Sequence, residues 1–298
     1  MNNAMEKEYY SNQPNMVLFE ITTKCNLSCV YCTARRLIKQ PADLPLEDIR
    51  CIAVQLEQFP YICLCGLGEA LMHKEFYQVL EILQDKKIVL VTNGSIPIDY
   101  VRLTKYKNID AISFSIDGTD EEEMKRISSN YRFDILLDNL MKSLTYGVNT
   151  AINCTLVKEN IDNIWKLKDL AIKYQVKKFK IGFPLGGSRW VVDHVEQIRE
   201  VLCKLKAGIE EEGIEFEGPT QIKCIFEGAP IAVVSKNGNT YPCCDYFCGR
   251  PLVGNLLHHQ FDTMWERESY HIFRTGKYCS QCTQYHRKSK VKELYQGI

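Results

Sequence analysis

The sequence predicts an α/β fold: a partial (β/α)6 TIM-like barrel followed by a small C-terminal extension. The first two thirds of the chain alternate between short, β-branched apolar runs and amphipathic stretches. Strands that alternate with helices form a parallel sheet with the helices outside it. Eight such units close a barrel, so the six found here indicate an open or partial one. In either case the functional site lies at the carboxyl ends of the strands.

The six expected strands are short runs in which valine, isoleucine and other apolar residues dominate. They are Val17–Ile21, Tyr61–Cys65, Ile88–Thr92, Ala111–Ile116, Thr150–Val157 and Lys178–Ile181. The expected helices carry apolar residues at intervals of three and four, as Ile49, Ile52 and Leu56 illustrate. The helices are Leu46–Phe59, Phe76–Leu83, Ile135–Tyr146, Ile164–Tyr174 and Val195–Glu212. Asp162 or Asn163 has a side chain suited to cap the fourth of them.

The pattern changes after Gly213. Ala232–Val234 and Thr240–Pro242 flank Asn237-Gly238-Asn239, which predicts a β-hairpin because the glycine supplies the positive φ of a tight turn. Short helices are expected at Phe261–Arg267 and Tyr270–Thr275. We therefore divide the chain into an N-terminal tail (1–15), a barrel (16–213) and a C-terminal domain (214–298).

Composition excludes several classes of protein. The chain has 298 residues, of which 45% are apolar and 25% charged, as in a globular protein rather than a disordered one. Its 37 basic and 37 acidic residues cancel, which argues against a nucleic-acid or anionic-membrane partner. The polar N-terminus does not resemble a signal peptide, and no segment has the ~18–20 apolar residues of a membrane span. We expect a cytoplasmic protein.

The 14 cysteines are too many for an ordinary reduced protein. Dispersed cysteines are typically small buried residues, whereas clustered ones indicate metal or redox chemistry. Five that lie singly or alternately among apolar residues are interpreted as packing residues: Cys51, Cys63, Cys65, Cys154 and Cys203.

Cys25, Cys29 and Cys32 form a C-x3-C-x2-C loop a few residues after the first expected strand. An iron–sulfur cluster normally takes four cysteines, so three leave one iron open to a substrate or cofactor. Two alternatives stay open: a zinc site completed by a distant residue, and three buried structural cysteines.

This spacing, with Tyr31 before the last cysteine, resembles the signature of the radical S-adenosylmethionine (SAM) superfamily. Gly66-Leu67-Gly68-Glu69-Ala70 resembles that family's Gly-Gly-Glu-Pro motif, with Leu67 and Ala70 in place of the first glycine and the proline. An ordinary strand-to-helix turn is the alternative for this segment.

Later segments continue the resemblance, which covers about residues 16–185. Thr92-Asn93-Gly94 resembles the ribose-side turn, and Ser113–Gly118 resembles the Ser-x-Asp-Gly element. The resemblance implies a SAM-binding [4Fe–4S] cluster on the three cysteines. The SAM-binding residues that it implies are Gly68, Glu69, Asn93, Ser115 and Asn153.

Four later cysteines match the number of ligands in a fully ligated [4Fe–4S] cluster: Cys224, Cys243, Cys279 and Cys282. Gly238-x4-Cys243 and the following Gly254-Asn255…Trp265 stretch resemble the SPASM/twitch extensions of radical SAM enzymes. Because SPASM types use around seven cysteines for two auxiliary clusters, four favour a second, single auxiliary cluster, the twitch arrangement. A structural zinc site on the same cysteines is the alternative.

The resemblance implies cleavage of SAM to a 5′-deoxyadenosyl radical that abstracts hydrogen from a substrate, with the electron supplied by a donor such as flavodoxin or ferredoxin. Likeness to twitch-type aminocyclitol dehydrogenases implies a two-electron oxidation with the auxiliary cluster as acceptor. It places Arg189 near SAM and substrate, although a surface arginine is equally consistent. The expected substrate is a polar small molecule (sugar- or aminocyclitol-like) or a peptide, and a first strand that begins by residue 17 favours the small molecule.

Two other functions stay open at this point. Cys248, or Cys244, could donate a hydrogen atom to the substrate radical, as in radical SAM epimerases, or each could simply be a packing residue. A non-catalytic iron–sulfur or zinc-binding protein is the other alternative.

Overall fold

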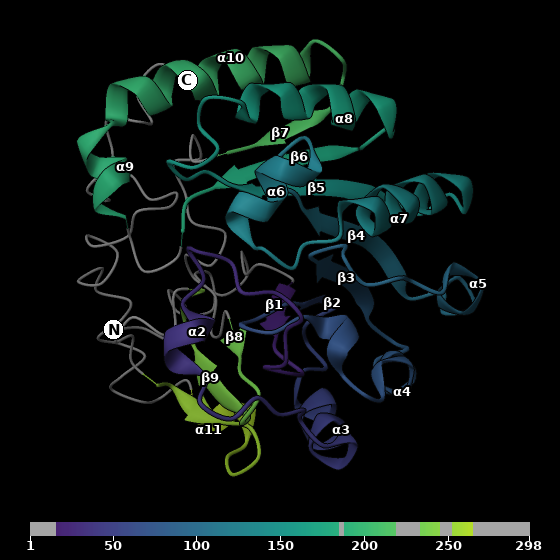
Figure 1. Ribbon diagram of the computed structural model, residues 1–298. Coiled ribbons are helices and arrows are strands. Elements are labelled where there is room, and N and C mark those ends of the chain that lie inside the picture. Colours follow the sequence, from purple (N-terminus) through teal and green to yellow (C-terminus); the bar gives the residue numbers. More distant parts are fainter. Residues whose placement is uncertain (1–15, 185–187, 219–232, 245–251, 265–298) are drawn as a thin grey trace, which may run out of the picture.

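The computed structural model describes residues 16–184, 188–218, 233–244 and 252–264 (Figure 1). Within those ranges one sheet of ten strands runs in the order β10-β9-β8-β1-β2-β3-β4-β5-β6-β7. Strands β1 to β7 are parallel and adjacent in chain order. This arrangement confirms the predicted α/β fold, in which each helical connection returns the chain to the next parallel strand.

The first six strands lie within two residues of the expected ones. They are β1 (Met16–Phe19), β2 (Tyr61–Leu64), β3 (Lys87–Thr92), β4 (Ile109–Ser115), β5 (Thr150–Thr155) and β6 (Lys178–Gly182). The expected fifth strand ran to Val157, but Asn160 ends it earlier: its amide accepts from the N–H of Val157 and donates to the carbonyl of Thr155. A seventh parallel strand, β7 (Glu215–Glu217), was not predicted because three residues rich in charge carry no apolar run.

The helices lie along the outside of the curved sheet (Figure 1). The longer ones are α3 (Leu46–Gln55), α4 (Phe76–Ile82), α6 (Glu121–Ile127), α7 (Phe133–Thr145), α8 (Leu167–Lys173) and α10 (Val195–Glu210). The shorter ones are α2 (Ala34–Leu37), α5 (Tyr100–Leu103), α9 (Arg189–Asp193) and α11 (Phe261–Met264). Neither Asp162 nor Asn163 caps through its side chain: the chain enters α8 through a 3₁₀ turn (Ile164–Lys166) instead.

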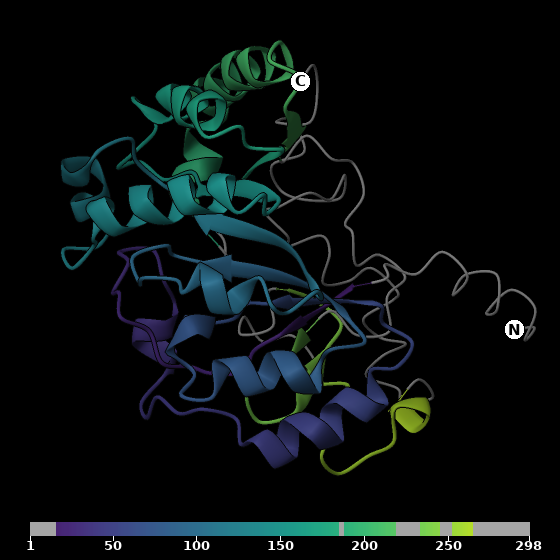
Figure 2. The same cartoon turned by 90° about the vertical axis from the view of Figure 1, so that its right-hand side faces the viewer.

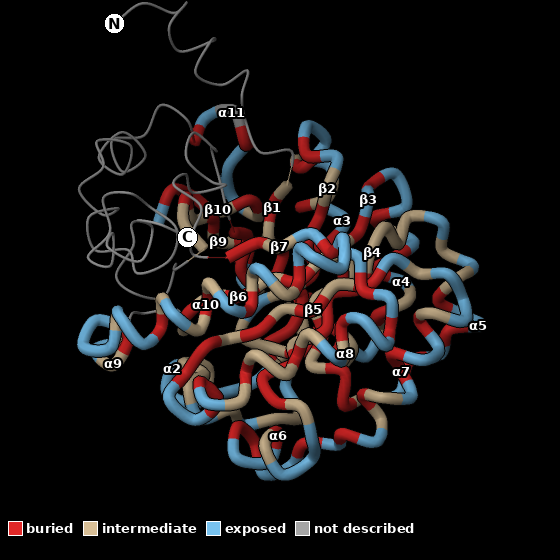
Figure 3. Tube along the Cα trace, turned by 90° about the horizontal axis from the view of Figure 1, so that it is seen from above, coloured by how far each residue is buried: buried red, intermediate tan, exposed pale blue. Residues whose placement is uncertain are grey.

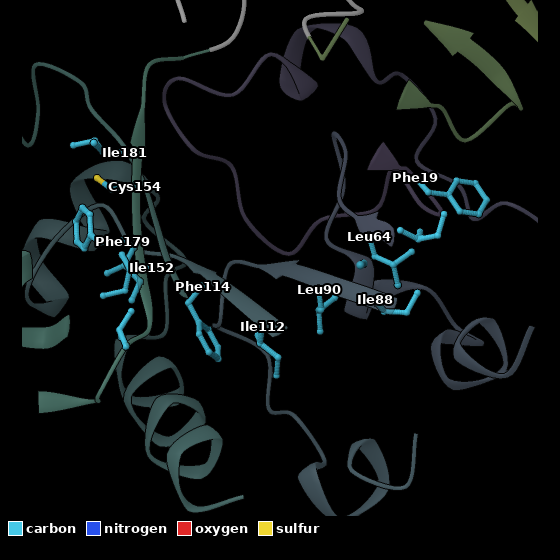
Figure 4. Close-up of a cluster of buried hydrophobic side chains, with 14 of the residues drawn as sticks. Phe19, Leu64, Ile88, Leu90, Ile112, Phe114, Ile152, Cys154, Phe179 and Ile181 are labelled. Carbon is cyan, nitrogen blue, oxygen red and sulfur yellow. The ribbon is translucent and has the colours of Figure 1, made fainter. Parts of the chain in front are cut away.

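The hydrophobic core lies between the strands and these helices. Alternate strand residues are buried on that side, and the tube seen from above shows the buried strands inside a more exposed rim of helices (Figure 3). Figure 4 shows this layer, which includes Phe19, Leu64, Leu90, Phe114, Ile152 and Phe179. Because successive strand residues point to opposite faces, the residues between them line the inner, concave face of the sheet.

The C-terminal segment joins the sheet beside β1. Strand β8 (Val233–Val234) pairs in parallel with β1, and β9 (Asn239–Tyr241) and β10 (Gly254–Asn255) follow antiparallel. Figure 2 shows this hairpin next to the first strand. The expected Asn-Gly turn is confirmed, with Gly238 at φ +74°. Among the residues that the structure describes, no helix is long and apolar enough to cross a membrane.

The five cysteines interpreted as packing residues differ in how far they are buried. Cys63 and Cys154 are buried, as predicted, and Cys65 and Cys203 are half-buried. For Cys51 the prediction was wrong, because this residue is exposed on α3. The buried residues of that helix are Ile49 and Ile52, and Cys51 lies on a different face of the helix from Ile49.

Candidate active site

The loops that follow β1, β2, β3 and β4 meet at the carboxyl edge of the sheet. The first of them, which carries the three cysteines, is fixed against the end of α6. The N–H of Ser28 donates to Oγ of Ser128 at 3.0 Å, and the N–H of Val30 donates to the carbonyl of Ile127 at 2.9 Å. Within the loop, the N–H of Cys32 donates to the carbonyl of Cys29. The cysteine loop therefore has a defined place over the edge of the sheet.

The three thiols are close enough to influence one another. Desolvation raises the pKa of Cys25 to about 11 and that of Cys29 to about 12, and the neighbouring thiol of Cys32 adds to both shifts. A metal group that binds here therefore has to displace protons, as thiolate ligation generally requires.

The donor set fits an iron–sulfur cluster. Three thiols in one loop can ligate three irons of a [4Fe–4S] cluster and leave the fourth open, whereas a structural zinc site takes four ligands. Within the described ranges, no three His, Cys, Asp or Glu side chains form a group that could hold a single metal ion.

Glu69 joins the second loop to the third. Its N–H donates to the carbonyl of Lys24 at 2.8 Å, which sets it beside the cysteine loop. Its carboxylate accepts from the N–H of Asn93 at 2.7 Å and from that of Leu71 at 3.2 Å. The side chain is buried, and burial raises its pKa to about 7 in spite of these hydrogen bonds. A buried carboxylate at this edge suits a cationic ligand.

We expect the affinity for SAM to fall as the pH drops below about 7. Below that pH the carboxyl of Glu69 takes up a proton and loses the charge that would attract the SAM ammonium. The expected loss approaches about tenfold per pH unit, measured as the dissociation constant of SAM by equilibrium dialysis between pH 6 and 8. The Glu69→Gln variant should bind more weakly and show a flat profile. A flat profile in the unmodified protein would contradict this assignment.

Gly68 allows the second loop to approach the first. A Cβ at this position would lie 2.3 Å from the carbonyl oxygen of Thr22 and 2.8 Å from that of Lys24. Both obstacles are backbone atoms, which cannot rotate away as a side chain can. The close approach of the two loops therefore requires glycine here.

Asn93 belongs to a closed ring of side-chain hydrogen bonds. Its Nδ2 donates to Oδ1 of Asn26, Nδ2 of Asn26 donates to Oγ of Ser95, and that hydroxyl donates to Oδ1 of Asn93. The donor–acceptor distances are 2.9, 2.9 and 2.8 Å. Asn26 lies next to Cys25, so the ring ties the third loop to the cysteine loop.

Asn139 on α7 anchors the third loop through hydrogen bonds to its backbone. This fully buried amide on α7 accepts from the N–H of Ile98 and donates to the carbonyls of Gly94 and Ile96. We expect Asn139→Ala to lower the free energy of unfolding by about 2–4 kcal/mol, because buried backbone groups lose their partners. Urea denaturation measures the change. Lys142→Ala, on the exposed side of the same helix, is the control and should stay within about 0.5 kcal/mol of the unmodified protein. Equal stability of both variants would contradict the role of Asn139.

Ser115 and Asn153 are neighbours on the inner face of the sheet. They are paired in register between β4 and β5, and both are half-buried. The same row continues through Lys180 on β6 to Glu217 on β7, and these two side chains form an ion pair at 2.9 Å. Lys180 and Glu217 were not among the site residues predicted from the sequence. A charged residue at every second position of the sixth strand was the signal that could have identified Lys180.

Asp117 was also missed, although its motif was noted. Its Oδ2 accepts from the hydroxyl of Tyr31 at 2.5 Å, and its Oδ1 accepts from the N–H of Thr155 at 2.7 Å. It is buried, and burial raises its pKa to about 6. Asp117 thus connects the aromatic residue of the cysteine loop to the end of β5.

The remaining predicted residues lie outside these four loops in the sequence. Arg189 opens α9 in the connection that follows β6, where its side chain is 93% exposed and pairs with Asp193. Its place near SAM and substrate stays a prediction. Cys243 and Cys244 follow β9 and are half-buried. Four predicted residues lie outside the described residues: Cys224, Cys248, Cys279 and Cys282.

The family comparison agrees with this geometry. Residues 19–171, just over half of the chain, match the family described as the radical SAM superfamily. The chain belongs to the radical SAM superfamily. Residues 224–283 of this radical SAM protein match a second family, SPASM, described as an iron–sulfur cluster-binding domain. The predicted superfamily, its SAM and [4Fe–4S] cofactors, and an iron–sulfur extension are thereby confirmed.

Known proteins resemble this radical SAM enzyme along most of its length. An AdoMet-dependent heme synthase of Methanosarcina barkeri is 24% identical, over 89% of this chain and 85% of that protein. Streptococcus suis SuiB, solved with its precursor peptide SuiA, has a TM-score of 0.72 at 16% identity and covers 91% of this chain and 69% of that one. The enzyme anSMEcpe, solved with AdoMet and the Kp18Cys peptide, has a TM-score of 0.69 at 16% identity and covers 94% of both. At these identities the solved structures show a shared fold.

Proposed function

We propose that this enzyme uses SAM to abstract a hydrogen atom from a polar substrate and then oxidises the substrate radical by one further electron. The observation that carries the proposal is the meeting of three loops at one edge: hydrogen bonds bring Glu69 and Asn93 against the loop of Cys25, Cys29 and Cys32. The overall reaction is then a two-electron dehydrogenation of a carbon that bears a hydroxyl or amino group.

Each predicted residue at this edge has its own proposed role. Cys25, Cys29 and Cys32 would hold the cluster that binds SAM, which when bound supplies a 5′-deoxyadenosyl radical by one-electron cleavage of the sulfonium bond. Among the SAM-binding residues, Glu69 orients the amino group, and Gly68 keeps the backbone close. The others are Asn93, which directly follows β3, Ser115 at the end of β4 and Asn153 on β5.

The C-terminal domain would take the second electron. The four cysteines proposed as its ligands, Cys224, Cys243, Cys279 and Cys282, all fall within the matched residues 224–283. A cluster with four cysteine ligands has no open iron, so electron transfer is its natural role. That this domain holds one cluster stays a prediction. The electron for SAM cleavage would come from a flavodoxin- or ferredoxin-like protein.

A polar substrate is supported by the inner face of the sheet. Ser115, Asn153, Lys180 and Glu217 form a continuous polar row there. A peptide is supported by the peptides bound to SuiB and anSMEcpe, and a small metabolite by the heme synthase. We therefore propose a polar metabolite or a peptide as the substrate. Candidate compounds of both classes can be compared, because the true substrate should stimulate 5′-deoxyadenosine formation.

Anaerobic reconstitution tests the proposal. We expect about eight irons per chain, four for each cluster, and 5′-deoxyadenosine that forms only when a reductant such as dithionite is present. A product lighter by two hydrogens indicates oxidation. Solvent deuterium in a product of unchanged mass would instead indicate epimerisation, and its loss in Cys248→Ala or Cys244→Ala would identify the hydrogen donor. Bound zinc without SAM cleavage would refute an enzymatic function.

A further inference from the structure

Glu20 links the SAM-binding edge to the C-terminal hairpin. It follows β1 directly and is 3% exposed, which is unusual for a carboxylate. Buried carboxylates need hydrogen-bond partners, and two N–H groups that donate to Glu20 come from distant parts of the chain.

The first partner is the turn that presents Glu69. Oε2 of Glu20 accepts from the N–H of Leu67 at 2.7 Å. Gly66 packs directly on the same side chain, since a Cβ there would lie 2.5 Å from Cγ of Glu20. The glycine-containing turn therefore rests on this carboxylate.

The second partner is the hairpin that leads to the proposed auxiliary-cluster ligand Cys243. Oε1 of Glu20 accepts from the N–H of Lys236 at 3.2 Å, and the N–H of Glu20 donates to the carbonyl of Val234 at 2.9 Å. Lys236 lies in the turn between β8 and β9, and Cys243 follows β9 by two residues. One carboxylate thus accepts from both elements, one oxygen to each.

We propose that Glu20 is a positioning residue that couples SAM binding to the auxiliary-cluster hairpin. The inference rests on the proposed role of Cys243 as a cluster ligand. A hairpin held by its cluster fixes Glu20, and a fixed Glu20 holds the turn that presents Glu69 in its binding position. Such coupling is reciprocal, so SAM should equally steady the hairpin.

A double-mutant cycle in the full, reconstituted chain tests the coupling, with the dissociation constant of SAM and the iron content as readouts. In the presence of Glu20, we expect Cys243→Ala to lower the iron content by about four per chain and to weaken SAM binding by about tenfold. Glu20→Gln keeps the shape of the side chain, but its amide presents N–H to one of the two backbone donors and so breaks one link. In this background Cys243→Ala should change SAM affinity less than about twofold. Glu122→Gln on α6, an exposed side chain, is the control and should preserve the full coupling.

Hydrogen exchange gives a readout that needs no cysteine variant. SAM should slow exchange of the amides of residues 233–241 in the reconstituted protein and should leave them unchanged in Glu20→Gln. Equal coupling in both backgrounds, or iron loss in Cys243→Ala with no change in SAM affinity, would overturn the inference alone. Full iron retention in Cys243→Ala would overturn the proposed ligand and the inference with it.

Discussion

Replacing Cys25 by alanine should abolish the reductive cleavage of SAM. The three thiols of the loop are the full set of protein ligands proposed for the SAM-binding cluster, so loss of one leaves the cluster with two. We expect 5′-deoxyadenosine formation to fall by more than about 100-fold. Loss of a residue that only hydrogen-bonds to a metal ligand costs up to about 100-fold, and loss of the ligand itself should cost more. Product is measured by chromatography after anaerobic incubation with dithionite and SAM.

Cys51→Ala provides the matched control for this experiment. Cys51 is an exposed cysteine on α3, away from the cysteine loop, and its replacement should leave both iron content and SAM cleavage unchanged. If Cys25→Ala kept its iron and its SAM cleavage, the N-terminal ligand assignment would be refuted.

The second large effect is expected for Gly68→Ala. The added methyl group would meet the carbonyl oxygens of Thr22 and Lys24, so one of the two loops has to move. We expect the free energy of unfolding to drop by about 1–3 kcal/mol, as overpacking typically costs, and SAM binding to be lost because Glu69 shifts with its loop. Urea denaturation and equilibrium dialysis measure the two effects separately.

Gly208→Ala distinguishes this contact from a general effect of removing a glycine. Gly208 lies within α10, where a Cβ would meet only the flexible end of Lys168 at 3.2 Å. Alanine favours the helix there, so this variant should be unchanged or more stable by up to about 1 kcal/mol. Unaltered SAM affinity in Gly68→Ala would show that the close approach of the loops is not needed for binding.

The parts of this fold that depend on local pattern could be predicted from the sequence. Each of the six strands is a short apolar run, and the cysteine loop, Gly68 and Glu69 lie in contiguous motifs that follow those runs. What escaped prediction depends on pairing between distant segments. Glu20 contacts residues 47 and 216 positions away, and Asp117 meets Tyr31 across 86 positions. The charged strand β7 is held by its neighbour β6 rather than by its own residues.

The position of β1 has a consequence for how the protein is made. Its neighbours in the sheet are β2 on one side and β8 on the other, and β8 begins at Val233. During synthesis the barrel's first strand therefore keeps one side of its backbone N–H and C=O groups unpaired until the C-terminal third of the chain has emerged. A chain cut after residue 213 would carry this open edge permanently, which makes the isolated barrel prone to edge-to-edge aggregation.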